Sequence, residues 1–216
     1  MDLTDLGTRG GPLAPRLIAA QLTIGCGARM RTETPRLVLD LVGPEHAADL
    51  FLVHSDPDVA YWSDAWSPEQ AAAAAAEMAR QWQADRVGKW IAHRRSDGAL
   101  VGRGGLSLAM VDGKRHLELG WALLRTARRQ GFATEIGRAG LDYAFGVLSH
   151  NEVVSFTDVH NRASRAVMER LGMTLVKIIY ERGLIEGRDG IHAAAPFALY
   201  RLRREDAAPP PAAEAR

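Results

Sequence analysis

The sequence predicts a mixed α/β domain, in which a mostly antiparallel sheet of about seven strands is flanked by about four helices. Two pairs in the middle of the chain, Asp97-Gly98 and Asp112-Gly113, are typical of hairpin turns and separate three β-rich runs. A capped, alanine-rich helical segment precedes these runs, and segments of helical period follow them. The expected order is therefore β-α-α-β-β-β-α-β-α-β-β.

The first part of this domain is expected to contain one strand and two helices. Arg36–Leu41 alternates apolar and polar residues, as a half-buried strand does. Pro44 begins a helix that should end at Asp56-Pro57, because the residue before a proline avoids the helical conformation. Ser67-Pro68-Glu69-Gln70 combines a capping serine, a first-turn proline and a glutamine at the third position, so a helix over about 67–86 is predicted.

A meander and then alternating helices and strands complete the domain. Asn161 is the expected N-cap of the last helix, and Gly172 its C-terminal stop. The predicted elements are, in chain order, strands Trp90–His93, Leu100–Met110 and His116–Leu124, a helix over 131–147, strand Val153–Thr157, a helix from Asn161 to Leu171, and strands Met173–Tyr180 and Ala195–Leu202.

Composition excludes several classes of protein. Of the 216 residues, 47% are hydrophobic and 25% are charged, which excludes wholesale disorder, collagen-like repeats and a protein of several membrane spans. The formal net charge of +1 gives no global field for nucleic acid, so we expect neither nucleic acid nor membrane as a partner. The single cysteine, Cys26, excludes a disulfide framework, and no histidine pair has metal-ligand spacing, so no metal is expected.

The two ends of the chain lack the patterning of its middle. Residues 1–31 are expected to form a flexible extension and 207–216 a disordered tail, which leaves 32–206 as the domain. Acidic residues precede the apolar stretch near the N-terminus, unlike a signal peptide, so a cytoplasmic location is expected. Met1 and Met30 remain alternative starts, because the patterned sequence begins just after Met30.

The segment Arg128–Thr134 is the strongest candidate for ligand binding. It lies between a predicted strand and a predicted helix, whose first turn offers backbone N–H groups and the positive end of a dipole. Gly131 would let a ligand approach closely, and Arg128 and Arg129 add positive charge, an arrangement that suits a pyrophosphate. A basic helix entrance with no ligand remains the alternative.

Three motifs occur in a fixed order along the chain. The first is Thr34-Pro35-Arg36-Leu37-Val38-Leu39, and the second joins Glu118-Leu119-Gly120-Trp121-Ala122-Leu123-Leu124 to Arg128-x-x-Gly131-x-Ala133-Thr134-Glu135. The third is Asn161-x-x-Ser164, continued by Leu171-Gly172-Met173. Together they resemble the GNAT N-acetyltransferases, and within that family the ribosomal-protein N-terminal acetyltransferases, over about Thr32–Glu205.

The resemblance implies acetyl-CoA as co-substrate and a sheet with a splayed central strand pair. Pantetheine would lie where the strands part, and an N–H near Leu123 would polarise the thioester carbonyl. Asn161 would bond the pantetheine arm, although helix capping alone would also account for this residue. The implied cofactor-binding residues are Ala122, Leu123, Leu124, Arg128, Arg129, Gln130, Gly131, Phe132, Ala133, Thr134 and Asn161.

Glu118, Ser164 and Asn161 are the implied catalytic residues. Glu118 would deprotonate the amine, directly or through water, or else it is a strand carboxylate paired with an arginine. Many relatives carry a tyrosine on the last helix as acid for the departing thiolate, but Val167 and Met168 occupy that region here. Ser164 is the nearest replacement in sequence, unless its hydroxyl only satisfies backbone in the first turn.

Candidate residues for the acceptor are aromatic or acidic. Trp62 and Trp121 are the predicted acceptor-binding residues, with Trp66 and Trp82 expected to cluster with Trp62, whereas packing in the core is the alternative for all of them. Asp58 and Asp64 would attract a cationic amine if they are not simply solvated loop acids.

The predicted function is transfer of an acetyl group from acetyl-CoA to a primary amine by direct attack in a ternary complex. The acceptor would be a protein N-terminus or a small amine, and the protein a monomer or homodimer. A second hypothesis is an acyl-CoA-binding sensor or scaffold of the same fold without turnover. A third is a nucleic-acid binder that uses Arg125, Arg128, Arg129 and Arg138.

Overall fold

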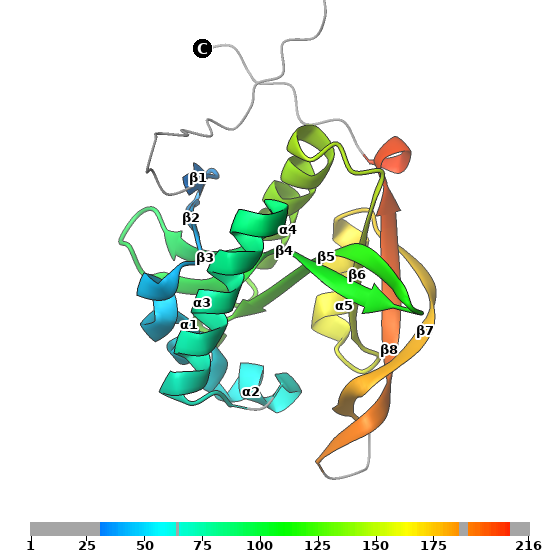
Figure 1. Ribbon diagram of the computed structural model, residues 1–216, viewed down its shortest axis with the longest axis horizontal. Coiled ribbons are helices and arrows are strands. Elements are labelled where there is room, and N and C mark those ends of the chain that lie inside the picture. Colours follow the sequence, from blue (N-terminus) through cyan, green and yellow to red (C-terminus); the bar gives the residue numbers. More distant parts are fainter. Residues whose placement is uncertain (1–30, 64, 186–189, 208–216) are drawn as a thin grey trace, which may run out of the picture.

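An eight-stranded sheet organises the chain in the computed structural model, which describes residues 31–63, 65–185 and 190–207 (Figure 1). Its order is β1-β2-β3-β4-β5-β6-β8-β7. The strands are β1 (Arg31–Glu33), β2 (Leu37–Leu41), β3 (Lys89–Arg94), β4 (Leu100–Val111), β5 (Lys114–Leu123), β6 (Glu152–Asp158), β7 (Thr174–Leu184) and β8 (Ile191–Arg203).

Five α-helices cover the sheet within the described residues. They are α1 (Ala47–Ser55), α2 (Pro57–Ser63), α3 (Pro68–Asp85), α4 (Phe132–Asp142) and α5 (Arg162–Arg170). Short helical turns occur at Pro44–His46, Arg125–Ala127, Tyr143–Val147 and Arg204–Asp206. The mixed, mostly antiparallel architecture confirms the predicted fold class.

The predictions for the two ends of the chain concern mostly residues that are not described. Apart from Arg31 and Ala207, the expected extension over 1–31 and the tail over 207–216 lie outside the described residues. The same is true of Met1, Cys26, Met30 and Asp64.

Local signals placed most elements correctly. Ser67 caps α3, because its hydroxyl accepts from the N–H of Gln70 at 3.2 Å while the Gln70 side chain accepts from the N–H of Ser67 at 2.7 Å. Asp112 and Gly113 both have positive φ, at 51° and 71°, as a two-residue hairpin turn requires. The meander of β3, β4 and β5 is antiparallel throughout, as predicted.

Two elements were not predicted, which raises the counts from seven strands and four helices. The strand β1 is only three residues long, too short to show an alternating pattern, and it pairs antiparallel with β2. Asp56-Pro57 ends α1 as expected but also begins α2, because proline is well suited to the first turn of a helix. Asp56 Oδ1 accepts from the N–H of Asp58 at 3.0 Å in that turn.

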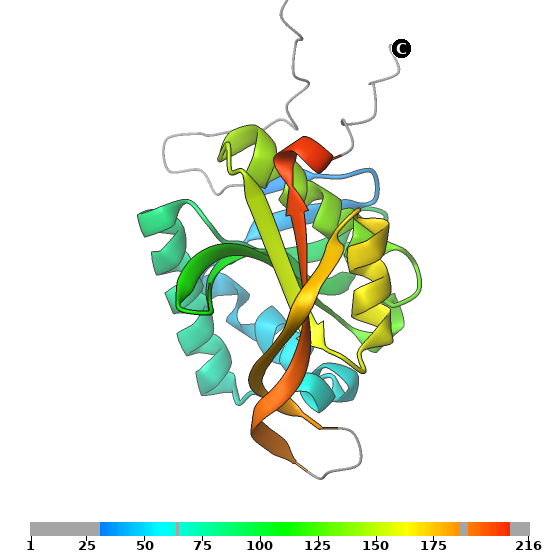
Figure 2. The same ribbon diagram turned by 90° about the vertical axis from the view of Figure 1, so that its right-hand side faces the viewer.

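Helices lie on both faces of the sheet (Figure 2). On one face, Ile91 of β3 packs with Leu50 of α1 and with Ala71 and Ala75 of α3. On the other face, a larger core joins side chains of β4 and β5 to α4 and α5 through Leu106, Leu117, Leu119, Leu141, Val167 and Met168. We call these the α1–α3 face and the α4–α5 face.

The alternation along β5 assigns its side chains to these faces. Leu117 and Leu119 are buried in the core of the α4–α5 face. Glu118, paired with Ser107 of β4, therefore points to the α1–α3 face, as do Gly120 and Ala122. Polar residues in the middle of the sheet are thus gathered beneath α1.

The central strands β5 and β6 part after a single point of contact. They pair in parallel only at Glu118 and Val154. Beyond that point β5 stays paired with β4 as far as Leu123, and β6 with β8 as far as Asp158. We call the diverging ends, 120–123 of β5 and 156–158 of β6, the β5–β6 fork. The fork confirms the splayed central strand pair.

A contact between backbones keeps the end of β5 against β4. Gly102 has a φ of 153°, and a Cβ at this position would lie 2.3 Å from the carbonyl oxygen of Ala122. We expect Gly102→Ala to lower the free energy of unfolding by about 2–3 kcal/mol, because both strain and collision fall on backbone. Denaturant unfolding measures the change.

Gly146→Ala is the matched control for this substitution. A Cβ at Gly146 would meet no atom within 4 Å, so the change should stay within about 1 kcal/mol. A loss at Gly102 no larger than that at Gly146 would contradict this account of the β4–β5 contact.

Candidate functional site

The end of β5 presents backbone groups to the β5–β6 fork. The N–H of Leu124 donates to the carbonyl of Val101, in β4, at 3.0 Å. Hydrogen bonding alternates along an antiparallel pair, so the neighbouring N–H and C=O of Leu123 point away from β4. They therefore face the side on which β6 has departed.

Side chains from outside β5 hold its outward-facing carbonyls. The buried hydroxyl of Ser155, in β6, donates to the carbonyl of Leu119 at 2.7 Å. Nε of Arg128 donates to the carbonyl of Leu123 at 3.2 Å. At both carbonyls, a side-chain donor takes the place that a backbone N–H of β6 would have if the two strands stayed paired.

The chain turns from β5 into α4 through the predicted phosphate loop. Arg129 and Gly131 have positive φ values of 59° and 82°, and Gly131 is the N-cap of α4. The first N–H groups of an α-helix have no partner within the helix, so those of Phe132, Ala133 and Thr134 are directed outward at its positive end. This geometry suits an anion.

The first sequence motif anchors this loop. Arg36 donates to the carbonyl of Gln130 at 2.8 Å, forms an ion pair with Glu135 at 2.6 Å, and lies over the ring of Phe132 at 4.6 Å. The hydroxyl of Thr34 donates to Glu135 at 2.6 Å. Burial acts to raise the pKa of Glu135, but the bonds from Thr34 and Arg36 outweigh it and hold the pKa below its usual value.

Arg128 is engaged differently from the prediction. Its Nη1 donates to Asp58 Oδ2 at 2.6 Å, so its guanidinium joins the end of β5 to α2. Asp58, predicted to attract a cationic amine, is therefore already paired with a cation. Asp56 accepts from the N–H of Arg125 at 2.8 Å, which adds a second link between α2 and the loop.

Besides Arg36, which is paired with Glu135, the basic groups beside the α4 N-terminus are Arg129 and Arg170. Arg129 is exposed in the loop. Arg170, in the last turn of α5, donates to the hydroxyl of Thr134 at 3.3 Å. Arg170 could not be predicted as a site residue from the sequence, because only the packing of α5 beside α4 brings it to the loop.

Glu118 lies at the base of the β5–β6 fork in a buried polar cluster. Its Oε2 accepts from Lys89 Nζ at 2.9 Å and from the hydroxyl of Ser107. Lys89 also donates to the carbonyl of Gly105 at 3.0 Å. The alternative to a catalytic Glu118 was a strand carboxylate paired with an arginine. The carboxylate is indeed paired, but with a lysine. Burial lowers the pKa of Lys89, against the opposing effect of Glu118.

The second oxygen of Glu118 is open. Among the described residues Oε1 has no hydrogen-bond partner, and it is not one of the buried atoms that lack one. It therefore reaches solvent on the α1–α3 face, where a proton could be accepted from an incoming group.

Asn161 and Ser164 lie where the chain leaves the β6 end of the fork and enters α5. Asn161 Oδ1 accepts from the N–H of Ser164 at 3.1 Å, which confirms Asn161 as the N-cap. Both side chains are half-buried, whereas Val167 and Met168 in the next turn are buried in the core. The side-chain amide nitrogen of Asn161 takes no part in the cap, because the oxygen accepts the capping bond.

The tryptophans do not form one aromatic wall. Trp62 meets Tyr61 edge-on at 4.8 Å between ring centroids, and Trp66 stacks on His54 at 3.5 Å. Trp82 packs in the core between β2, β3 and α4, and half-buried Trp121 packs against the core of the α4–α5 face. The expected cluster is therefore wrong, since Trp66 and Trp82 pack against different parts of the core and Trp62 contacts Tyr61.

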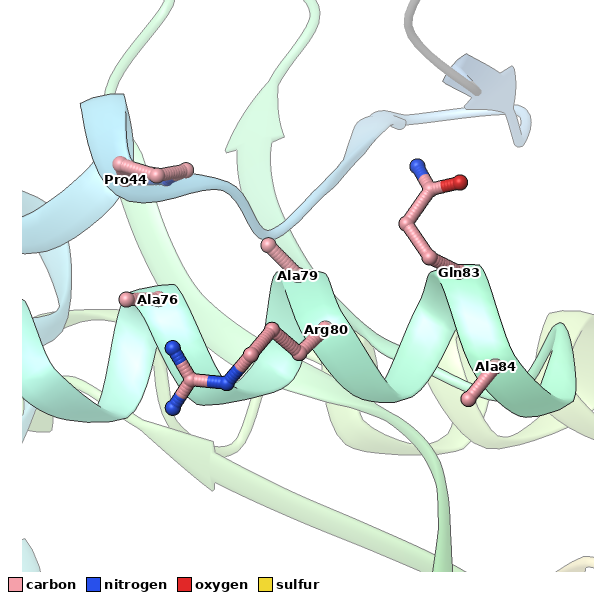
Figure 3. Close-up of a pocket in the computed structure, with 6 residues that line it drawn as sticks. All are labelled: Pro44, Ala76, Ala79, Arg80, Gln83 and Ala84. Carbon is pink, nitrogen blue, oxygen red and sulfur yellow. The ribbon is translucent and has the colours of Figure 1, made fainter.

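The outer side of α3 carries a shallow hollow of about 650 Å³ (Figure 3). Half of its lining residues are alanine, and Figure 3 shows the side chains of Arg80 and Gln83 pointing apart, so no set of polar groups converges there. In the described part of the chain, no group of three or more His, Cys, Asp or Glu side chains is placed to hold a metal ion. No helix there is long and apolar enough to cross a membrane.

Known proteins share this architecture. The uncharacterized N-acetyltransferase YoaA of Bacillus subtilis (strain 168) is 28% identical over 160 residues, which cover 70% of this chain and 89% of the relative. A GnaT-family acetyltransferase of Bordetella pertussis superimposes with a TM-score of 0.67 at 21% identity, covering 80% of this chain and 99% of that one.

The ribosomal-protein-S5-alanine acetyltransferase of Vibrio fischeri also superimposes with a TM-score of 0.67, at 14% identity, covering 83% of this chain and 100% of that one. At such identities the structural likeness shows the fold alone. A model of the acetyltransferase (GNAT) domain matches residues 36–174, a span that includes the fork, the α4 N-terminus and α5. Because this match extends over more than half of the chain, the protein belongs to the GNAT acetyltransferase family.

Proposed function

We propose that the protein is an N-acetyltransferase that moves an acetyl group from acetyl-CoA to a primary amine. The observation that carries the proposal is the β5–β6 fork, whose end leads directly into an anion-binding helix start. A thioester arm needs a strand edge with unused backbone groups, and its pyrophosphate needs N–H groups and cations nearby. The fork and the α4 N-terminus offer both in sequence.

The proposed complex uses residues on both sides of the fork. The pyrophosphate binds the N–H groups of 132–134, with Arg129 and Arg170 as cations. Pantetheine follows 122–124 of β5, and the amide nitrogen of Asn161 donates to it from the other side. The N–H of Leu123 then donates to the thioester carbonyl and stabilises the oxyanion of the tetrahedral intermediate.

The acetyl transfer needs one proton acceptor and one proton donor. Glu118 takes a proton from the ammonium through Oε1, directly or through water, while Lys89 and Ser107 hold Oε2. The neutral amine attacks the carbonyl carbon, the new C–N bond forms, and the C–S bond breaks to release the thiolate. The nitrogen of the tetrahedral intermediate carries one proton more than the amide product, and Ser164 is the proposed group that passes this proton on, donating its own proton to the thiolate as it takes the one from the nitrogen. Most of the acceleration comes from holding the amine and the thioester together.

The acceptor is a protein N-terminus or a small amine. The ribosomal-protein-S5-alanine acetyltransferase among the structural neighbours supports the first class by its fold alone. Trp62 is the proposed apolar contact of the acceptor, whereas Trp121, also expected there, packs on the α4–α5 face, opposite Glu118. The proposed location is the cytoplasm.

The proposal predicts that Gly131→Asp weakens acetyl-CoA binding. The new carboxylate would stand at the α4 N-terminus and repel the pyrophosphate, so affinity measured by calorimetry should fall at least about tenfold. Gly113→Asp is the matched control, because Gly113 has a similar φ of 71° but lies at the β4–β5 turn.

Glu118→Gln should bind acetyl-CoA normally yet release thiol at least about tenfold more slowly with any amine that the wild type uses.

These variants separate turnover from binding alone. If the wild type binds acetyl-CoA but releases no thiol with a panel of primary amines and N-terminal peptides, the protein is a binding module and not an enzyme. Equal affinity of the Gly131→Asp and Gly113→Asp proteins for acetyl-CoA would instead show that acetyl-CoA does not bind at the α4 N-terminus.

Asn161 is predicted to act both in the protein and on the cofactor. Asn161→Ser keeps a capping side chain, so its stability should match the wild type within about 0.5 kcal/mol, whereas Asn161→Ala should lose about 1 kcal/mol. Both variants lack the amide nitrogen, so both should bind acetyl-CoA several-fold more weakly. Normal affinity in Asn161→Ser would leave the residue with capping as its whole role.

A further inference from the structure

Arg103 is a cation without a carboxylate partner on the α1–α3 face. Lys89, the other cation of this part of the sheet, is paired with Glu118. Among the described residues, no carboxylate lies within ion-pair distance of Arg103. A half-buried guanidinium in this position is costly to desolvate unless an anion joins it.

A neutral histidine fixes the orientation of Arg103. Its Nε donates to His54 Nε2 at 2.8 Å, and His54 is buried and stacks on Trp66 with an interplanar angle of 3°. Burial, and then the nearby Arg103, lower the pKa of His54 to about 3, so this imidazole is neutral and accepts the bond at physiological pH. His54 therefore holds the guanidinium without neutralising its charge.

The remaining nitrogens of Arg103 are available to a ligand. Within the described part of the chain, Nη1 and Nη2 make no hydrogen bond, and neither is among the buried atoms that lack a partner. Both nitrogens therefore reach solvent. An arginine whose Nε is occupied still offers its two terminal N–H groups side by side, a geometry that matches the two oxygens of a carboxylate.

The location of Arg103 links it to the acceptor rather than to the cofactor. Arg103 is the register partner of Ala122, the residue before Leu123, and it shares a face with Glu118. Under the proposed function this is the side from which the amine approaches the thioester. The proposed pyrophosphate site is at the start of α4, which packs on the opposite face. The phosphates of CoA are therefore not the anion that pairs with Arg103.

We infer that Arg103 binds a carboxylate of the acceptor, and that the acceptor is therefore an amine that also carries a carboxylate, as an α-amino acid does. The inference rests on the proposed function. The amine is directed toward Glu118 Oε1 and the thioester, while the carboxylate pairs with Nη1 and Nη2 of Arg103. His54 and Trp66 keep the guanidinium in place.

Matched acceptors test this inference. Each α-amino acid is compared with its amide, which keeps the amine and the side chain but lacks the negative charge. The wild type should use the acid at least tenfold better than the amide in kcat/KM. Arg103→Gln should lower kcat/KM for the acid at least tenfold, mainly through KM, and change that for the amide less than threefold. Equal use of acid and amide by the wild type, or equal losses for both in the variant, overturns the inference.

Two further measurements distinguish loss of carboxylate binding from a folding defect. The Arg103→Gln protein must bind acetyl-CoA as the wild type does, because its substitution lies outside the proposed cofactor site. If that protein does not fold, Arg103→Lys carries the test, since it keeps the charge but loses the paired N–H groups. An unchanged preference for the acid in Arg103→Lys overturns the inference, whereas a reduced preference supports it.

The same acceptors distinguish failure of this inference from failure of the proposed function. If the wild type releases no thiol with any amine, the proposed transfer is wrong, and calorimetry with the CoA-saturated protein then decides about Arg103. Binding of acid but not amide, lost in Arg103→Gln, supports the carboxylate site, and absence of acid binding overturns it. Peptides with glutamate or glutamine as second residue show whether a peptide side chain supplies the carboxylate.

Discussion

The parting of β5 and β6 is the constraint on which the rest of the site depends. The two strands meet only at Glu118 and Val154, after which β5 follows β4 and β6 follows β8. The edge of β5 near Leu123 is then left without a partner strand inside the protein. An edge of this kind is costly where water is excluded, and a ligand with amide and carbonyl groups can complete it. The α4 N-terminus follows directly, so one continuous surface serves an extended, anionic molecule.

Segments distant in sequence hold this surface in place. Arg36 and Thr34 bind Glu135 across 99 and 101 residues, and Arg128 reaches Asp58 across 70. Individual hydrogen bonds of this kind contribute about 1 kcal/mol each, so their joint effect is on geometry more than on stability. The opposite face is arranged differently: Lys89, Glu118 and Ser107 share one cluster, while Arg103 leans on a neutral His54. The cofactor side is thus preorganised by ion pairs, whereas on the acceptor side two cations, Lys89 and Arg103, act on the single carboxylate of Glu118.

Local chemistry made much of the fold predictable. The caps at Ser67 and Asn161 and the turn at Asp112-Gly113 depend on residues three or fewer positions apart, and each forms as expected. Pairings across the sheet could not be predicted in this way. The partners Lys89–Glu118 and His54–Arg103 are 29 and 49 residues apart, so their meeting depends on strand order and register. For the same reason the sequence suggested Arg128 for the phosphates, whereas the fold turns it to Asp58 and brings Arg170 to the loop.

Amide hydrogen exchange followed by NMR, with and without acetyl-CoA, tests the central claim most directly. If the thioester arm occupies the β5–β6 fork, the amide of Leu123 and those of Phe132–Thr134 should exchange markedly more slowly in the complex. Amides of the β4–β5 turn at Asp112-Gly113 should not change. Binding of acetyl-CoA that leaves both segments at their unliganded exchange rates would contradict the claim that the fork receives the cofactor.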